Sequence, residues 1–104
     1  MNAVSVERFQ DRARVSVTGD LDLSQRDRFI AEIAAASETG TAIVLDLLRL
    51  ESIDSTGLSS IIQADRLVRA QGGPPMKVLI ADEGPVRRMF ELTLLHLTLD
   101  VSTG

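Results

Sequence analysis

Residues 43–62 read IVLDLLRLESIDSTGLSSII and contain the clearest structural signal in the chain. Residues 43–48 form an apolar run, and a short polar segment leads from it to Asp54-Ser55-Thr56-Gly57-Leu58. A helical pattern begins at once after this motif. Three small oxygen-bearing side chains therefore stand where a loop turns into a helix. Free backbone N–H groups and the positive end of the helix dipole allow such a place to hold a negative charge at little cost.

The two halves of this stretch predict a strand and a helix. Residues 43–47 are almost continuously apolar, which is typical of a central strand covered on its faces. A helix is predicted over residues 57–70. Its residues facing the sheet are Leu58, Ile61, Ile62 and Val68. Asp65 falls in the same arc at about 100° per residue, so either the helix leaves the sheet there or part of this face meets a partner.

Two short strands are predicted near the N-terminus. Val4, Val6 and Phe9 indicate the first. Residues 13–17 alternate apolar and polar side chains, which indicates a half-buried second strand. Gly19 ends this strand.

A loop over residues 20–23 and a helix follow. Ser24 is a suitable N-cap, and Asp27 lies three residues later, as in a capping box. The helix is expected to run to about Ser37, with Gly40 just past its end. Its apolar face consists of Phe29, Ile30, Ile33 and Ala34.

The C-terminal third predicts a strand, a helix and a last strand. Residues 76–80 form the strand, and Pro85 suits the first turn of the helix. The inner face of this helix consists of Val86, Met89, Phe90 and Leu94. Leu97, Leu99 and Val101 alternate with polar residues and indicate the last strand.

The predicted order is ββαβαβαβ, which indicates an α/β fold. We expect a single domain over residues 1–104, with a mixed β-sheet of about four to five strands and helices packed on it. The later strands are separated by helices, so they should pair in parallel. The first two strands can form a hairpin.

Composition points to a globular cytosolic protein. The 104 residues are 44% hydrophobic and 25% charged, as in a folded domain. No apolar run reaches about 18 residues, so no transmembrane helix or membrane contact is expected. The N-terminus does not resemble a signal peptide. The absence of cysteine fits the cytoplasm.

The net charge of −4 and the absence of a basic block argue against direct nucleic-acid binding. The acidic balance permits docking to a basic partner, or it serves solubility alone.

The sequence gives little indication of an enzyme active site. His96 is the only histidine, lies among leucines, and is expected at the surface or its boundary. Ser55 has no base near it in sequence, and the Gly-x-Ser-x-Gly elbow is absent. Phosphate-binding and dinucleotide-binding glycine motifs are also absent, so no cofactor is expected.

Four carboxylates raise the alternative of a Mg²⁺-dependent receiver that is phosphorylated on aspartate. They are Asp20, Asp22, Asp46 and Asp54. Receiver domains alternate strand and helix from the start, however, and need about one more helix and strand than this chain provides. We therefore expect no metal site.

The hydroxyls of the Asp54-Ser55-Thr56-Gly57-Leu58 motif remain as candidate functional groups. Any one of its first three residues could serve as the helix N-cap, for about 1 kcal/mol. Three candidates in a row exceed that need. Gly57 also permits a close backbone approach or a turn with positive φ.

At this level of detail the chain resembles the STAS-domain anti-sigma-factor antagonists, which are bacterial partner-switching regulators. Four segments match in order and spacing. They are Gly19-Asp20-Leu21-Asp22, Val44-Leu45-Asp46-Leu47 leading to Ile53-Asp54-Ser55-Thr56-Gly57-Leu58, Gly72-Gly73, and Gly84-Pro85-Val86-Arg87-Arg88-Met89-Phe90.

The resemblance implies a non-enzymatic switch. Ser55 matches the serine that an anti-sigma factor serine kinase phosphorylates. The unphosphorylated protein binds that kinase and so releases a sigma factor, and a serine phosphatase restores it after phosphorylation. The residues expected at the partner surface or around the phosphoserine are Asp20, Asp22, Asp54, Thr56, Gly57 and Leu58. A monomer or weak dimer is expected.

A second hypothesis keeps the fold without the switch. The domain would then be a constitutive scaffold or a subunit of a lipid-transport complex. The chain also departs from the family pattern at two places. Thr93-Leu94-Leu95 stands where family members commonly have glycine, and Ser59-Ser60 replaces small or apolar residues.

Overall fold

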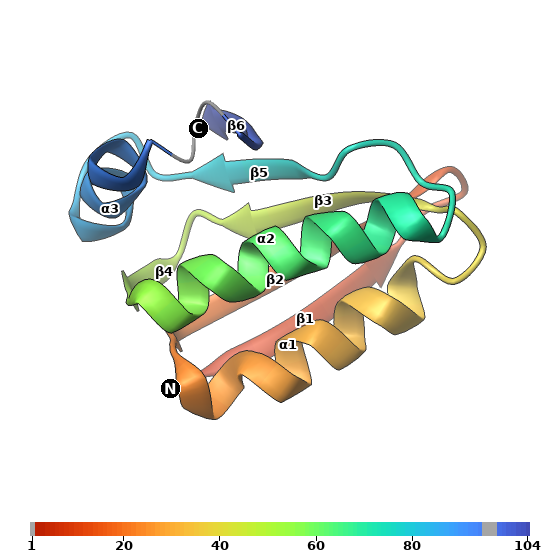
Figure 1. Cartoon of the computed structure of the whole chain (residues 1–104), viewed down its shortest axis with the longest axis horizontal. Helices are drawn as coiled ribbons and strands as arrows, with labels where there is room; N and C mark the ends of the chain where they lie inside the picture. The colour runs from red at the N-terminus through yellow and green to blue at the C-terminus, as the bar shows by residue number, and fades with distance from the viewer. Residues whose placement is uncertain (1, 95–97) are drawn as a thin grey trace.

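The computed structural model describes residues 2–94 and 98–104. Within these residues it contains six strands and three helices in the order ββαββαβαβ (Figure 1). The strands are β1 (Ala3–Arg8), β2 (Arg12–Leu21), β3 (Ala42–Leu47), β4 (Leu50–Ile53), β5 (Lys77–Ile80) and β6 (Asp100–Thr103). The helices are α1 (Leu23–Ala36), α2 (Ser55–Ala70) and α3 (Pro85–Thr93).

The sheet is mixed, as predicted. Its strand order is β1-β2-β3-β5-β6, and β4 pairs with the far end of β2. β1 and β2 form the antiparallel hairpin, and the later pairs are parallel. The α/β class with helices packed on a mixed sheet is therefore confirmed.

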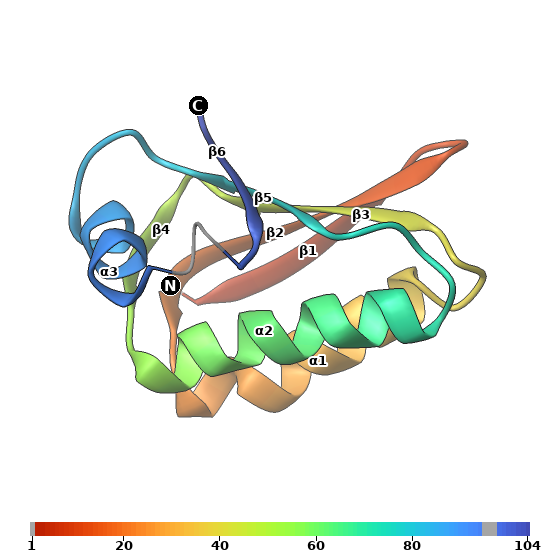
Figure 2. The same ribbon diagram turned by 45° about the horizontal axis from the view of Figure 1, so that its top comes forward.

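The molecule has two layers. Figure 2 shows α1 and α2 together beneath one face of the sheet, with α3 at the end beside β4. Val15, Leu45 and Val78 are successive neighbours across β2, β3 and β5, and each is fully buried. Burial of such a side chain contributes about 1.5–3 kcal/mol. This row forms the centre of the core, between the sheet and the two long helices.

The expectation that β3 is covered on its faces was wrong. Its burial alternates, with Ile43, Leu45 and Leu47 buried and the residues between them only partly so. Asp46 points to the other face, where its Oδ2 accepts bonds from Arg14 Nη2 at 2.6 Å and Nε at 3.0 Å. Val44 is an apolar residue on that second face. It makes the sequence of residues 43–47 almost continuously apolar, although only one face of the strand is covered.

Two strand boundaries near the site also differ from prediction. Gly19 does not end β2, because its φ of 81° accompanies a shift in register that lets the strand continue to Leu21. The segment after β3, expected to be a polar connection, forms β4. Leu50 and Ile53 anchor it in the core, and it pairs with β2 from Gly19 to Leu21. Asp20 thus belongs to a strand rather than a loop.

The N-cap of α1 was also misplaced. Asp22 is the cap, and its Oδ1 accepts hydrogen bonds from the Ser24 backbone N–H at 3.0 Å and from Ser24 Oγ at 2.6 Å. Asp22 rather than Ser24 is the cap because its side chain reaches a free N–H group of the first helical turn while its own backbone stays extended. Phe9 lies outside β1 in the turn before β2, is 47% exposed, and has the Arg12 guanidinium 5.1 Å from its ring centroid.

Asp65 fits neither of its two interpretations. Val68 beyond it is fully buried, so α2 has not left the sheet. Asp65 is itself buried, and its Oδ1 accepts a hydrogen bond from the Met76 N–H at 2.9 Å. Its Oδ2 pairs with Arg69 Nε at 3.1 Å. The carboxylate therefore satisfies a buried backbone donor at the start of the segment leading into β5.

The last strand, β6, begins at Asp100, later than the predicted alternation from Leu97. Leu97 and His96 lie outside the described residues. Leu99 is buried, and Val101 faces Val78 across the β5–β6 pair.

Candidate functional site

Two helices begin side by side at one edge of the sheet. β2 and β4 run parallel with Leu21 beside Ile53, and each strand is followed at once by an aspartate that caps a helix. Asp22 caps α1, and Asp54 caps α2. The predicted site residues therefore gather at the carboxyl ends of two parallel strands, which is where α/β folds commonly bind partners and ligands.

Asp54 alone performs the capping of α2. Its Oδ1 accepts a hydrogen bond from the Gly57 N–H at 2.9 Å, and its carbonyl oxygen accepts one from the Leu58 N–H at 3.0 Å. The hydroxyls of Ser55 and Thr56 make no hydrogen bond within residues 2–94 and 98–104. Ser55 is exposed at the first position of the helix, and Thr56 is half-buried. The cap therefore leaves the Ser55 hydroxyl available for another role.

Gly57 and Leu58 hold the helix start against the sheet. A Cβ atom on Gly57 would lie 2.2 Å from the Leu21 carbonyl oxygen and 2.7 Å from Ile53 Cγ1. Leu58 is only 5% exposed and belongs to the core. The motif thus divides into an exposed hydroxyl and two residues that fix its position.

Asp20 is held toward β4. Its Oδ1 accepts a hydrogen bond from Ser52 Oγ, and its backbone N–H donates to Asn2 Oδ1 at 2.9 Å. Asp22 and Asp54 are the carboxylates at the helix starts. Together they give the strand-end side of the site an acidic character.

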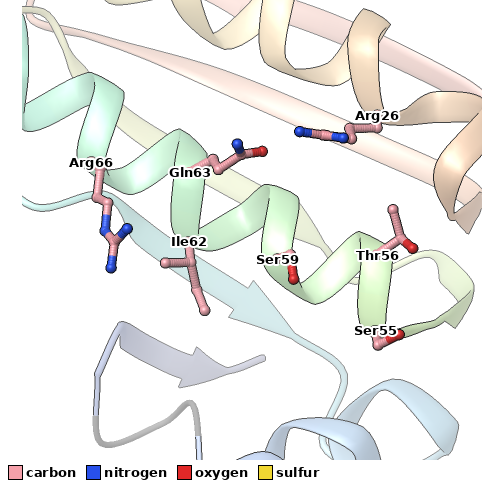
Figure 3. A pocket seen from close by; sticks show the side chains of 7 residues that line it. All are labelled: Arg26, Ser55, Thr56, Ser59, Ile62, Gln63 and Arg66. Carbon is pink, nitrogen blue, oxygen red and sulfur yellow. The ribbon is translucent and has the colours of Figure 1, made fainter.

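A depression of about 450 Å³ extends from Ser55 along α2 (Figure 3). Its lining combines hydroxyl, amide, guanidinium and aliphatic groups. These belong to Arg26, Ser55, Thr56, Ser59, Ile62, Gln63 and Arg66. Two guanidinium groups and no carboxylate line it, although the chain as a whole carries a net charge of −4.

Most of these lining residues lie outside the Asp54–Leu58 motif and were not predicted as site residues. Ser59, Ile62 and Arg66 follow Ser55 at helical spacing, so a face of α2 beyond the motif could have been found from the 3.6-residue period. Ile62 was assigned to the sheet-facing side. It does pack against the core, but it is only partly buried and also lines the depression. Arg26 comes from α1, and no local pattern indicates that it lies near α2.

The four carboxylates considered for a metal do not converge. Asp46 is paired with Arg14 on the other face of the sheet, and Asp20 is bonded to Ser52. Among residues 2–94 and 98–104, no group of three acidic, histidine or cysteine side chains is arranged to hold a metal ion. In the same part of the chain, no helix has the length and apolar character needed to span a bilayer.

Among residues 2–94 and 98–104, one side chain has a displaced pKa. The pKa of the Arg87 guanidinium is raised, chiefly by its hydrogen bond to Glu91. It lies on α3, outside the depression.

Residues 4–99 match the family model described as "Mlab, STAS domain". The chain belongs to the STAS domain family. The family resemblance seen in the sequence is therefore confirmed over nearly the whole chain. No curated protein matches the sequence.

Solved structures share this STAS fold. An anti-sigma factor antagonist from Mycobacterium paratuberculosis has 24% identity and a TM-score of 0.83, over 97% of this chain and 85% of that chain. The anti-sigma factor antagonist SpoIIAA in its unphosphorylated form has 22% identity and a TM-score of 0.78, covering 98% and 88%. The phosphorylated form of the Bacillus protein SpoIIAA has 21% identity and a TM-score of 0.68, covering 98% and 91%. At these identities the likeness is one of fold.

Proposed function

We propose that this STAS domain is a non-enzymatic anti-sigma-factor antagonist whose partner binding is switched by phosphorylation of Ser55. The unphosphorylated domain binds an anti-sigma factor serine kinase in the cytoplasm and thereby releases a sigma factor. The observation that carries the proposal is that capping of α2 and exposure of a free hydroxyl belong to two different, adjacent residues. Asp54 makes the cap, and the adjacent Ser55 hydroxyl is exposed and unbonded among the described residues.

The chemistry of the switch is a phosphoryl transfer performed by the kinase. The γ-phosphoryl group of ATP moves to Ser55 Oγ, ADP leaves, and the hydroxyl proton is lost. The product carries about −1.5 to −2 charge at neutral pH. Free N–H groups of the first helical turn stabilise such a charge, so the fold should survive the modification. A serine phosphatase reverses the step by hydrolysis.

The charge change is large enough for a switch. A loss of about 3 kcal/mol in binding free energy weakens an interface by roughly a hundredfold. Asp22 and Asp54 make the strand-end side of Ser55 acidic, and a phosphate on Ser55 would add to the repulsion that they exert on an acidic partner surface. The phosphate would also fit poorly into an interface built for a neutral hydroxyl. SpoIIAA, which shares this fold, is known in unphosphorylated and phosphorylated forms, and this supports the same regulation here.

The direct test is phosphorylation by an anti-sigma factor kinase encoded in the same genome. The domain is incubated with the kinase and ATP, and the modified residue is mapped by mass spectrometry. We expect phosphate on Ser55 and none on a Ser55→Ala variant. Phosphate on Thr56 or Ser59 instead of Ser55 would refute the assignment. Stable binding without any phosphorylation would favour a non-switching interaction module.

A further inference from the structure

The depression beside Ser55 has a charge opposite to that of the whole molecule. The chain has 15 acidic and 11 basic residues, yet this surface contains Arg26 and Arg66 and no carboxylate. Its other groups are hydroxyls, one amide and the partly buried side chain of Ile62. A positive, partly apolar surface is therefore set into an acidic protein.

Both guanidinium groups are available to a partner. Neither Arg26 nor Arg66 forms an ion pair within residues 2–94 and 98–104, whereas Arg69 on the same helix pairs with Asp65 at 3.1 Å. Figure 3 shows Arg26 reaching from α1 over one side of α2, and Arg66 standing on α2 beyond Ile62. The two positive groups thus come from separate helices: Arg26 lies on the side of α2 that carries Gln63, and Arg66 stands beside Ile62.

From this arrangement we infer that the depression is the docking surface for an acidic segment of the kinase partner. Carboxylates of that segment pair with Arg26 and Arg66, and an apolar side chain packs on Ile62. Arginine suits this role because its planar guanidinium donates two parallel hydrogen bonds to one carboxylate. The inference rests on the proposed function and adds the chemistry by which the partner is recognised.

The same surface explains the direction of the switch. Ser55 lines the depression, so its phosphate would place about −1.5 to −2 charge at the edge of the docking surface. That charge repels the carboxylates of the partner and competes with them for the positive field of the two arginines. Phosphorylation therefore weakens the complex without requiring a change of fold.

The experiment is calorimetric titration with the kinase that phosphorylates Ser55, bound to ADP and without ATP. Arg26→Gln and Arg66→Gln should each raise Kd by about five- to tenfold, and Arg66→Glu by about thirtyfold or more. The affinity of the unmodified domain should fall steeply between about 50 and about 500 mM salt, and less steeply for the double Gln variant. All variants should retain their melting temperature, since neither arginine forms an ion pair in the described part of the chain.

Arg49 provides the matched control. It is exposed and lines a different depression, on the sheet face that carries Arg14 and Asp46. Arg49→Gln and Arg49→Glu make the same charge changes and should alter Kd by less than about twofold, because that face is remote from α2. If Arg66→Glu binds as tightly as the Arg49 variants while Ser55 is still phosphorylated, the docking surface is refuted and the proposed function stands. If no kinase binds or phosphorylates the unmodified domain, both fail.

Discussion

The backbone of Gly57 passes so close to Leu21 that a Cβ atom at position 57 would lie 2.2 Å from the Leu21 carbonyl oxygen. The first turn of α2 is thus pressed against the end of β2. This contact fixes where the exposed Ser55 hydroxyl stands relative to the two neighbouring strand ends.

Gly57→Ala should therefore destabilise the domain. The carbonyl is backbone and cannot rotate away, so α2 or β2 must shift, and overpacking of this kind costs about 1–3 kcal/mol. Urea denaturation followed by circular dichroism measures the loss. Ser59→Ala, at an exposed position on the same helix, is the control and should change the free energy of unfolding by less than about 0.5 kcal/mol. Equal stability of the two variants would contradict the close approach.

Substitutions at the adjacent residues Asp54 and Ser55 should have different effects on stability, because Asp54 caps α2 and Ser55 does not. Asp54→Ala removes the acceptor of the Gly57 N–H and should lower the free energy of unfolding by about 0.5–2 kcal/mol. Ser55→Ala removes no hydrogen bond among the described residues, so thermal denaturation should show little change. Asp22→Ala, which uncaps α1, should resemble Asp54→Ala. A Ser55→Ala loss as large as that of Asp54→Ala would show that the serine is needed for the fold.

Local patterns in the sequence predicted the elements that local forces determine. The alternation over residues 13–17 indicated β2. The helical period after the polar motif indicated α2, although the helix begins at Ser55 rather than at residue 57. β4 was missed because its burial does not alternate: Leu50 and Ile53 are buried, and the two residues between them are exposed. Its stability comes from pairing with β2, which lies about 30 residues earlier in the chain.

The same distinction applies to the candidate site. Ser55 could be predicted as a site residue because its motif is contiguous, and Arg66 lies on a helical face that the 3.6-residue period defines. Arg26 joins them only because α1 and α2 pack side by side, which is a tertiary fact. Asp65 was misread for a similar reason: the Met76 N–H that it satisfies lies 11 residues away, beyond a turn.

The end of α3 offers a stabilising substitution. Leu94 caps the helix in the left-handed conformation with φ of 55°, and it is 56% exposed. Glycine adopts this conformation without the cost of about 1–2 kcal/mol that a side chain incurs, and little buried apolar surface is lost. Leu94→Gly should therefore raise the free energy of unfolding by about 1 kcal/mol, measured in urea. Leu92→Gly, at a more exposed position inside the helix, should instead lower it by about the same amount.

A charge mimic at Ser55 should separate binding from folding. Ser55→Asp places a carboxylate at the first position of α2, where the helix dipole favours it by about 0.3–1 kcal/mol. Its circular dichroism spectrum should therefore match that of the unmodified domain, and its melting temperature should be equal or slightly higher. Its affinity for the anti-sigma factor kinase should fall by about tenfold or more, since the new charge faces the partner surface. Ser59→Asp, one turn later in the same depression, should weaken binding less if the kinase closes directly over Ser55. Full binding by Ser55→Asp together with full binding by the phosphorylated domain would exclude a switch at this serine.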